Sequence, residues 1–247
     1  MRSHSSFRSF VLIGGLVAAA LPVQAQMVRI PNPDAPRFLV ATPKAADKKL
    51  AAAAADALTG RFSADIPFRT LWVLPRADVA RTLDGSGYPV DEALSSDDVN
   101  RLAKLLKTDE YIESEVTKTE TGYRIEAKLI LAKDQELQQP LVVAEADKLD
   151  KAAAIISRDL QDARKQLSAE KSCEKASKEG KWDVAITAAR NGATVYPRAT
   201  ISRICEMNAV AKAGKPSAEV KAAAGEILKI DPKSPKALAA EASGDDK

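Results

Sequence analysis

The sequence predicts an α+β body, with a mixed sheet and packed helices, followed by an all-α segment of helical repeats. As far as residue 167, short apolar runs alternate with longer amphipathic stretches, which is typical of strands and helices in one domain. Beyond residue 167 only helical patterns follow. Two of these stretches end at Tyr196-Pro197 and Asp231-Pro232, about one helical-hairpin period (~34 residues) apart.

The first 25 residues predict a secretory signal peptide. Arg2 and Arg8 precede an apolar run, Phe10–Leu21, and small residues lead to Ala25, after which we expect cleavage. The alternative is a membrane anchor, but the run is shorter than the roughly 20 apolar residues that span a bilayer. No cysteine lies near the cut to carry a lipid. We therefore expect a periplasmic protein with no transmembrane segment in the mature chain.

Cleavage also removes His4, the only histidine. Without an imidazole the mature chain has no Ser/His or Cys/His catalysis and no histidine-bound zinc. Serine/lysine or carboxylate chemistry stays open, but no motif supports it. We predict that the protein is not an enzyme, with no catalytic, cofactor-binding or metal-ligating residues. Loss of Arg2 and Arg8 brings the net charge of +3 close to neutral, which gives no case for a nucleic-acid partner.

The mature chain opens with a predicted linker, residues 26–36, which contains Pro31, Pro33 and Pro36. The apolar run that follows, Phe38–Ala41, predicts a buried strand.

The next stretch, Ala45–Leu58, is rich in alanine and carries its leucines on one face, so it predicts a helix that ends at Gly60. A second apolar strand is expected at Thr70–Leu74, before Pro75. A short helix is expected at Ala77–Leu83.

A capping sequence, Ser95–Asp98, precedes an apolar helical stripe in Val99–Leu106. Two strands should follow, Tyr111–Val116 and Tyr123–Leu131, because the second alternates apolar and polar residues cleanly. The turn Glu120–Gly122 between them predicts a hairpin.

The remaining elements of this body complete the sheet and cover it. We expect a polar loop at Gln135–Pro140, a further strand at Leu141–Val143 and a helix at Asp150–Leu167. Together these elements make one body at 37–167.

This body resembles the amino-terminal domain of TolB and its relatives, among them curli-secretion (CsgG-like) and LpoB-like envelope proteins. The resemblance covers about 37–167 and rests on the early strand, the helix that ends at Leu58, and the stretch Leu102–Ile112 that leads into the hairpin with Gly122. Lys107-Thr108 replaces the usual Gly-Ala of the family. The resemblance implies an envelope interaction domain with no catalytic residues.

Residues 168–242 resemble tetratricopeptide repeats. Gly180 stands at the turn of the first helix pair, Trp182 follows it, Ala185 allows close helix contact and Pro197 ends the unit. The second unit matches at Gly214–Pro216, Val220, Ala224, Ile227 and Asp231-Pro232. Such stacks imply binding of other chains.

Five residues of the repeats are candidate sites. Cys173 and Cys205 could form a disulfide between successive first helices, or could be two small buried residues. Glu174, Lys178 and Lys212 are expected on the inner face of the stack as polar groups for a partner. The alternative is that these charges only solvate the helices.

Two functions are compatible with the sequence. The first is a non-enzymatic periplasmic adaptor for protein–protein interaction in the bacterial cell envelope, whose partners are other envelope proteins or peptides. The second is a self-associating accessory of an outer-membrane assembly or secretion system, which would make it an oligomer. A polar tail is expected at 243–247, and we expect the two bodies to be separable near Leu167.

Overall fold

The computed structural model describes residues 34–243, which belong to one compact unit. The predicted signal peptide, its cleavage after Ala25 and nearly all of the polar tail lie outside the described residues. Within the described part, no helix has both the length and the apolar character needed to cross a membrane.

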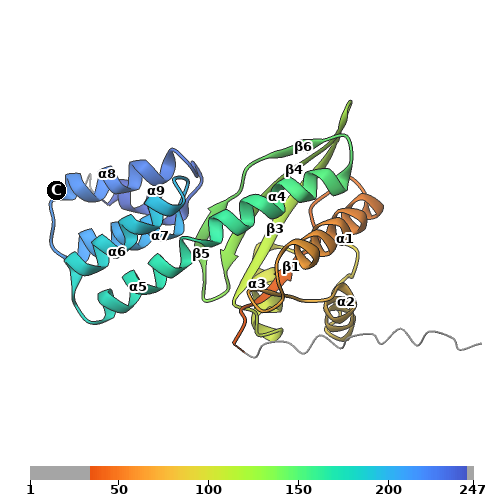
Figure 1. Cartoon of the computed structure of the whole chain (residues 1–247), viewed down its shortest axis with the longest axis horizontal. Coiled ribbons are helices and arrows are strands. Elements are labelled where there is room, and N and C mark those ends of the chain that lie inside the picture. The colour runs from red at the N-terminus through yellow and green to blue at the C-terminus, as the bar shows by residue number, and fades with distance from the viewer. Residues whose placement is uncertain (1–33, 244–247) are drawn as a thin grey trace, which may run out of the picture. The chain divides into compact units, whose positions relative to one another are not determined.

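A mixed sheet and a set of helical hairpins make up the fold, which confirms the predicted α+β class (Figure 1). The strands are β1 (Arg37–Val40), β2 (Trp72–Val73), β3 (Glu110–Thr119), β4 (Gly122–Leu131), β5 (Asp134–Pro140) and β6 (Ala144–Ala146). The helices of the same body are α1 (Lys48–Asp65), α2 (Arg76–Gly85), α3 (Ser96–Leu105) and α4 (Leu149–Arg164). The helical hairpins that follow are α5 (Leu167–Lys178), α6 (Trp182–Val195), α7 (Ile201–Lys212), α8 (Ser217–Leu228) and α9 (Pro235–Ala242).

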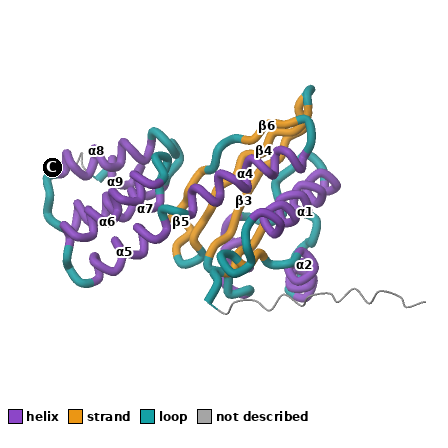
Figure 2. The backbone as a smooth tube through the Cα atoms, in the orientation of Figure 1, coloured by secondary structure: helices purple, strands orange, loops and turns teal. Residues whose placement is uncertain are grey.

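The strand order is β2-β1-β3-β4-β5. The short strand β6 also pairs with β4, along a part of β4 that β5 does not cover. β1 runs parallel to β2 and β3, whereas β3, β4 and β5 form an antiparallel meander. The sheet is flanked by helices (Figure 2). α1 and α4 lie side by side over one face (Figure 1), where Phe38 and Ile112 join the larger core. α2 and α3 cover the other face, where Leu39 and Tyr111 join a second core.

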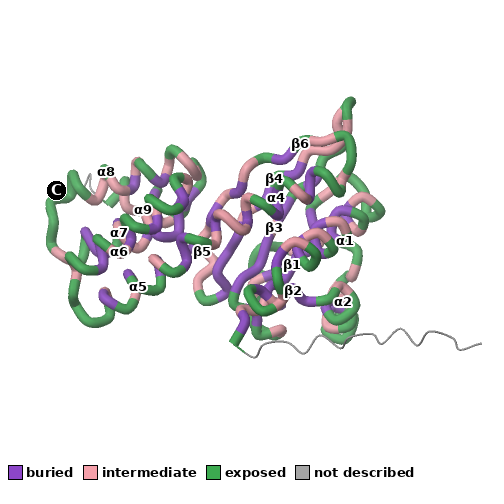
Figure 3. Tube along the Cα trace, in the orientation of Figure 1, coloured by how far each residue is buried: buried purple, intermediate pink, exposed green. Residues whose placement is uncertain are grey.

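Strand alternation explains these two cores, because successive side chains of a strand point to opposite faces. Residues 38–40 of β1 and 111–112 of β3 are buried on both faces (Figure 3), so these short runs are apolar. The predicted helix cap is confirmed: the Ser95 side chain accepts a hydrogen bond from the backbone N–H of Asp98. The predicted hairpin is confirmed as well, with Thr119 paired to Gly122 across the turn.

Two predictions around the last strands were wrong. Residues Asp134–Pro140 are the strand β5 and not a loop, and the one buried polar side chain of this strand, Gln139, finds hydrogen-bond partners in other elements. The apolar run Leu141–Val143 is not a strand. The backbone N–H of Val142 donates to a carboxylate oxygen of Asp159 at 2.7 Å, and pairing with β4 resumes only at β6.

The end of α1 was also predicted wrongly. Gly60 does not stop this helix, which continues to Asp65. The extra turn buries Phe62 completely against Phe38, at 5.8 Å between ring centroids. Burying a phenylalanine is worth about 1.5–3 kcal/mol, which outweighs the ~0.5–1 kcal/mol cost of a glycine inside a helix. The helix expected at 150–167 is confirmed as α4, which ends three residues earlier, at Arg164, and α5 begins at Leu167.

Each of α5 to α8 packs on the helix that follows it, and α5 also packs on α7. The turns after α5 and α7 need a left-handed residue, and Gly180 (φ 71°) and Gly214 (φ 69°) supply it. Behind the first turn, a small core of Cys173, Ala185 and Val210 fills the space between α5, α6 and α7.

Ala185→Trp should destabilise this stack. Ala185 is fully buried in α6, so a tryptophan must displace the neighbouring helices, at a typical cost of about 1–3 kcal/mol or more. Urea denaturation of the variant measures the loss. Val184→Trp is the matched control, because Val184 lies on the same helix and is 57% exposed. Equal stability of both variants would contradict the packing described.

Candidate functional site

Two buried glutamines join the helical hairpins to the sheet. Gln139 on β5 and Gln166, between α4 and α5, are both fully buried. The Gln166 amide donates to the side-chain oxygen of Gln139 at 2.8 Å. The side-chain oxygen of Gln139 also accepts a hydrogen bond from the backbone N–H of Thr200 at 2.7 Å. The side-chain oxygen of Gln166 accepts one from the backbone N–H of Ser202 at 3.1 Å. The glutamines thereby satisfy N–H groups at the start of α7 that a helix cannot pair by itself.

Charged and phenolic groups reinforce this junction. The Tyr196 hydroxyl, at the end of α6, lies 3.2 Å from a carboxylate oxygen of Asp159 on α4. Burial, and then the charge of Asp159, raises the pKa of Tyr196, so its hydroxyl stays protonated as a donor. On α9, Lys236 binds both Asp134 and Glu136 of β5, at 3.1 and 3.0 Å.

A further link comes from Lys133, in the turn between β4 and β5. Its ammonium binds Glu170 at 2.7 Å and also binds Glu174, both on α5. Burial lowers the pKa of Lys133, but the hydrogen bonds that Lys133 donates to Glu170 and Glu174 outweigh this effect and leave the pKa raised. Hydrogen bonds from Lys133 and then Lys178 lower the pKa of Glu174. Lys133 and Glu174 therefore both stay ionised at neutral pH.

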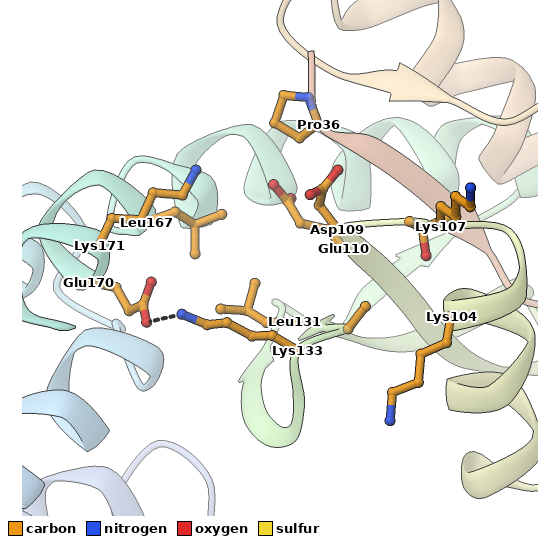
Figure 4. A pocket seen from close by; sticks show the side chains of 12 residues that line it. Pro36, Lys104, Lys107, Asp109, Glu110, Leu131, Lys133, Leu167, Glu170 and Lys171 are labelled. Atoms are coloured by element: carbon orange, nitrogen blue, oxygen red, sulfur yellow. Dashed lines mark hydrogen bonds and ion pairs between the residues drawn. The ribbon is translucent and has the colours of Figure 1, made fainter. Parts of the chain in front are cut away.

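A cavity of about 450 Å³ lies at this junction (Figure 4). We call it the junction cavity. The end of α3, the start of β3, the β4–β5 turn and the first turns of α5 contribute its walls. Its apolar part is lined by Pro36, Leu131, Ala132 and Leu167. Figure 4 shows Lys133 reaching toward Glu170 beside Leu131.

The carboxylates in the junction cavity already have partners within the protein. Glu110 is bound through both of its oxygens by Arg164 of α4, at 2.7 and 3.0 Å. Asp109 accepts the backbone N–H of Arg37 at 2.8 Å, and Glu170 is held by Lys133.

The lysines at the rim differ from these carboxylates. Lys104 and Lys107, at the end of α3, and Lys171 on α5 line the junction cavity and are exposed. Among residues 34–243, none of the three forms a salt bridge with a carboxylate. Lys171 lies on one side of the cavity and Lys107 on the other (Figure 4). The rim therefore presents three lysines that form no ion pair with the described residues, in a cavity that also contains the carboxylate of Asp109.

The three residues predicted for partner binding do not line the junction cavity. Glu174 lies at the edge of the cavity, where it binds Lys133, one of the lining residues. Lys178, one turn further along α5, pairs with Glu174 at 2.8 Å. Lys212 is exposed on the last turn of α7 and is not part of that cluster. Their role with a partner stays a prediction.

Cys173 and Cys205 form a disulfide that connects α5 to α7, with 6.4 Å between their Cα atoms. Cys173 is fully buried in the small core of the stack. The bridge closes a loop of 32 residues that contains the whole of α6.

Replacing both cysteines by alanine should cost about 2–4 kcal/mol of stability, because the unfolded chain gains the conformational freedom that the bridge removes. Urea denaturation under oxidising conditions measures the difference. Dithiothreitol should shift the wild-type protein toward the variant and leave the variant unchanged. Equal midpoints for the oxidised wild type and the variant would show that the disulfide adds no stability.

The remaining candidate chemistry is sparse. In the part of the chain that the structure describes, no group of three or more histidine, cysteine, aspartate or glutamate side chains is placed to hold a metal ion. A second cavity of about 450 Å³ lies over α6, α7 and α8, where the Arg190–Glu206 ion pair of 2.7 Å occupies its wall.

Comparisons with known proteins show a distant similarity to a solved structure. No family of known proteins matches the sequence, and no curated protein matches it. Among solved structures, the chain is similar to a lipoprotein from Neisseria meningitidis. The match covers 45% of this chain and 80% of that one, with 19% identity and a TM-score of 0.32. A likeness of this degree carries no argument about function.

Proposed function

We propose that the protein is a non-enzymatic, exported adaptor that binds other proteins or peptides of the bacterial cell envelope. One observation carries this proposal. Buried side-chain hydrogen bonds fix the helical hairpins to the sheet and leave a cavity at the junction, with an apolar wall and a basic rim. A prearranged surface of this kind loses little entropy on binding, which favours a binding protein.

The disulfide supports the exported location. Disulfides persist in oxidising compartments such as the bacterial periplasm and are rare in the cytosol. The bridge between α5 and α7 fits the signal-peptide pattern in the first 25 residues. Mass analysis of the mature amino terminus tests export, and a product that starts at Met1 would contradict it.

Affinity capture tests the adaptor role. The mature protein is used to capture partners from an envelope extract, and each partner is then purified and tested alone for direct binding. A variant with reversed charges at Glu174, Lys178 and Lys212 tests the predicted inner face of the stack. We expect a defined binary complex. Failure of every captured protein to bind directly would contradict the proposal.

The self-associating accessory is distinguished by the size of the mature protein in solution. Light scattering should give the mass of a monomer if the protein is an adaptor. A ring or other large oligomer would instead support the accessory function.

A further inference from the structure

We propose that the junction cavity binds an acidic segment of another polypeptide, with an apolar side chain of that segment against Leu131 and Leu167 and its carboxylates against the rim lysines. This inference rests on the proposed function and names the site and the chemistry of the partner. It follows from three properties of the junction cavity: its charge, its size and wall, and the surface beside it.

The charge of the cavity selects an anionic ligand. Each carboxylate that lines it is bound inside the protein: Asp109 by a backbone N–H group, Glu110 by Arg164 and Glu170 by Lys133. The ammonium groups of Lys104, Lys107 and Lys171 have no such described partner, so they are the groups available to a ligand. A carboxylate of the partner would supply the missing counter-charge.

The size and wall of the cavity select a side chain with apolar surface. A volume of about 450 Å³ lies within the usual range for ligand sites, roughly 300–1,000 Å³. Leu131, Ala132 and Leu167 are largely buried and form a firm apolar wall. A free inorganic anion would leave this wall uncovered, whereas a leucine or similar side chain would cover it.

The surface beside the cavity points to a chain rather than a small molecule. Leu105 stands between the rim lysines in the sequence and is 60% exposed, the most exposed large apolar side chain that the structure records. The last turn of α3 therefore presents an exposed apolar side chain next in sequence to Lys104, a rim residue. A polypeptide can occupy the cavity and contact Leu105 with a neighbouring residue, and such contacts exclude water around the charged groups.

Two short peptides test the inference on the isotope-labelled mature protein. The probe is acetyl-Glu-Glu-Leu-Glu-Glu-amide, and the uncharged control is acetyl-Gln-Gln-Leu-Gln-Gln-amide. The acidic peptide should shift the methyl NMR signals of Leu131 and Leu167, with an affinity that falls as salt is added. Equal binding of both peptides, or shifts confined to other surfaces, would overturn the inference.

Charge reversal identifies the groups responsible. Lys104→Glu, Lys107→Glu and Lys171→Glu together should weaken the acidic peptide by about tenfold or more, because three favourable ion pairs become repulsive. Lys118→Glu, Lys175→Glu and Lys233→Glu together are the matched control, since these lysines are also exposed but lie outside the cavity lining. Equal loss in both triple variants would show diffuse attraction and overturn the inference.

Anionic lipid is the competing ligand. If vesicles of phosphatidylglycerol bind through the same three lysines and the acidic peptide does not, the site serves a membrane and the inference is wrong.

Failure of the inference is distinguishable from failure of the adaptor role. A captured partner that still binds the rim-reversed variant at full strength would leave the adaptor in place and remove the junction cavity as its site.

Discussion

Replacing Gln139 by leucine should lower the free energy of unfolding by about 2–6 kcal/mol. The leucine removes the side-chain oxygen that accepts hydrogen bonds from the Thr200 backbone N–H and from the Gln166 amide. Both donors belong to residues that are fully buried, Thr200 and Gln166. Each unsatisfied buried donor costs roughly 1–3 kcal/mol, which gives the expected sum.

Gln138→Leu is the matched control for this prediction. Gln138 is the neighbouring residue on the same strand, but its amide bonds only Lys128 and the backbone of Gln135. Both of these partners are near the surface, so the control should lose less than about 1 kcal/mol. Urea denaturation followed by far-ultraviolet circular dichroism measures both variants.

The shape of the transition is a second readout. The larger core contains residues of α4 and of α7 and α8, so the sheet and the hairpins share apolar contacts as well as hydrogen bonds. If Gln139→Leu loosens α7 alone, the transition should broaden or divide in two. If Gln139→Leu is as stable as Gln138→Leu, the glutamine pair does not hold the junction. Whether residues 37–167 fold alone stays a prediction, which the melting curve of that fragment tests.

Local patterns were sufficient to predict most of the sheet body. The cap at Ser95 and the hairpin at Gly122 follow from neighbouring residues. Strand β4 was found because its apolar residues alternate over a long stretch. Each of these signals depends on residues within a few positions of each other, which a sequence displays directly.

Strand β5 could not be predicted in the same way. Its sequence is mostly polar, and what makes Gln139 a buried residue is a set of partners 27 and 61 residues further along the chain. The helix that continues past Gly60 is a related case, since the gain comes from packing of Phe62 on a distant strand. Propensity favours a break there, and tertiary contact overrides it.

The junction cavity was missed for the same reason. Lys104, Lys133 and Lys171 lie on three different elements, and in the sequence each appears as an ordinary surface lysine. These lysines differ in whether a carboxylate lies within ion-pair distance, and the fold decides which of them has one. The prediction of Glu174 came nearest, because this residue pairs with Lys133 at the edge of the cavity.

Arg164→Met should destabilise the protein by about 3–5 kcal/mol. Arg164 makes two hydrogen bonds to Glu110, and the side chains are only 13% and 6% exposed. Removing the arginine leaves a buried carboxylate without its counter-charge, which costs far more than the pair itself contributes. Arg158→Met is the matched control, because Arg158 is exposed on the same helix, and it should change stability by less than about 0.5 kcal/mol.

The double variant Glu110→Leu with Arg164→Met should recover most of the loss, since apolar replacement of a buried ion pair is often nearly neutral. Failure to recover would mean that Arg164 matters for packing and not for charge.

Because Glu110 lines the junction cavity, the same variants also bear on binding. Arg164→Met alone adds an unbalanced negative charge to the cavity and should weaken the acidic peptide. The double variant removes that charge and should restore the affinity while Lys104, Lys107 and Lys171 are intact. If the affinity instead follows the stability of each variant and not the charge of its cavity, the rim lysines do not select the ligand.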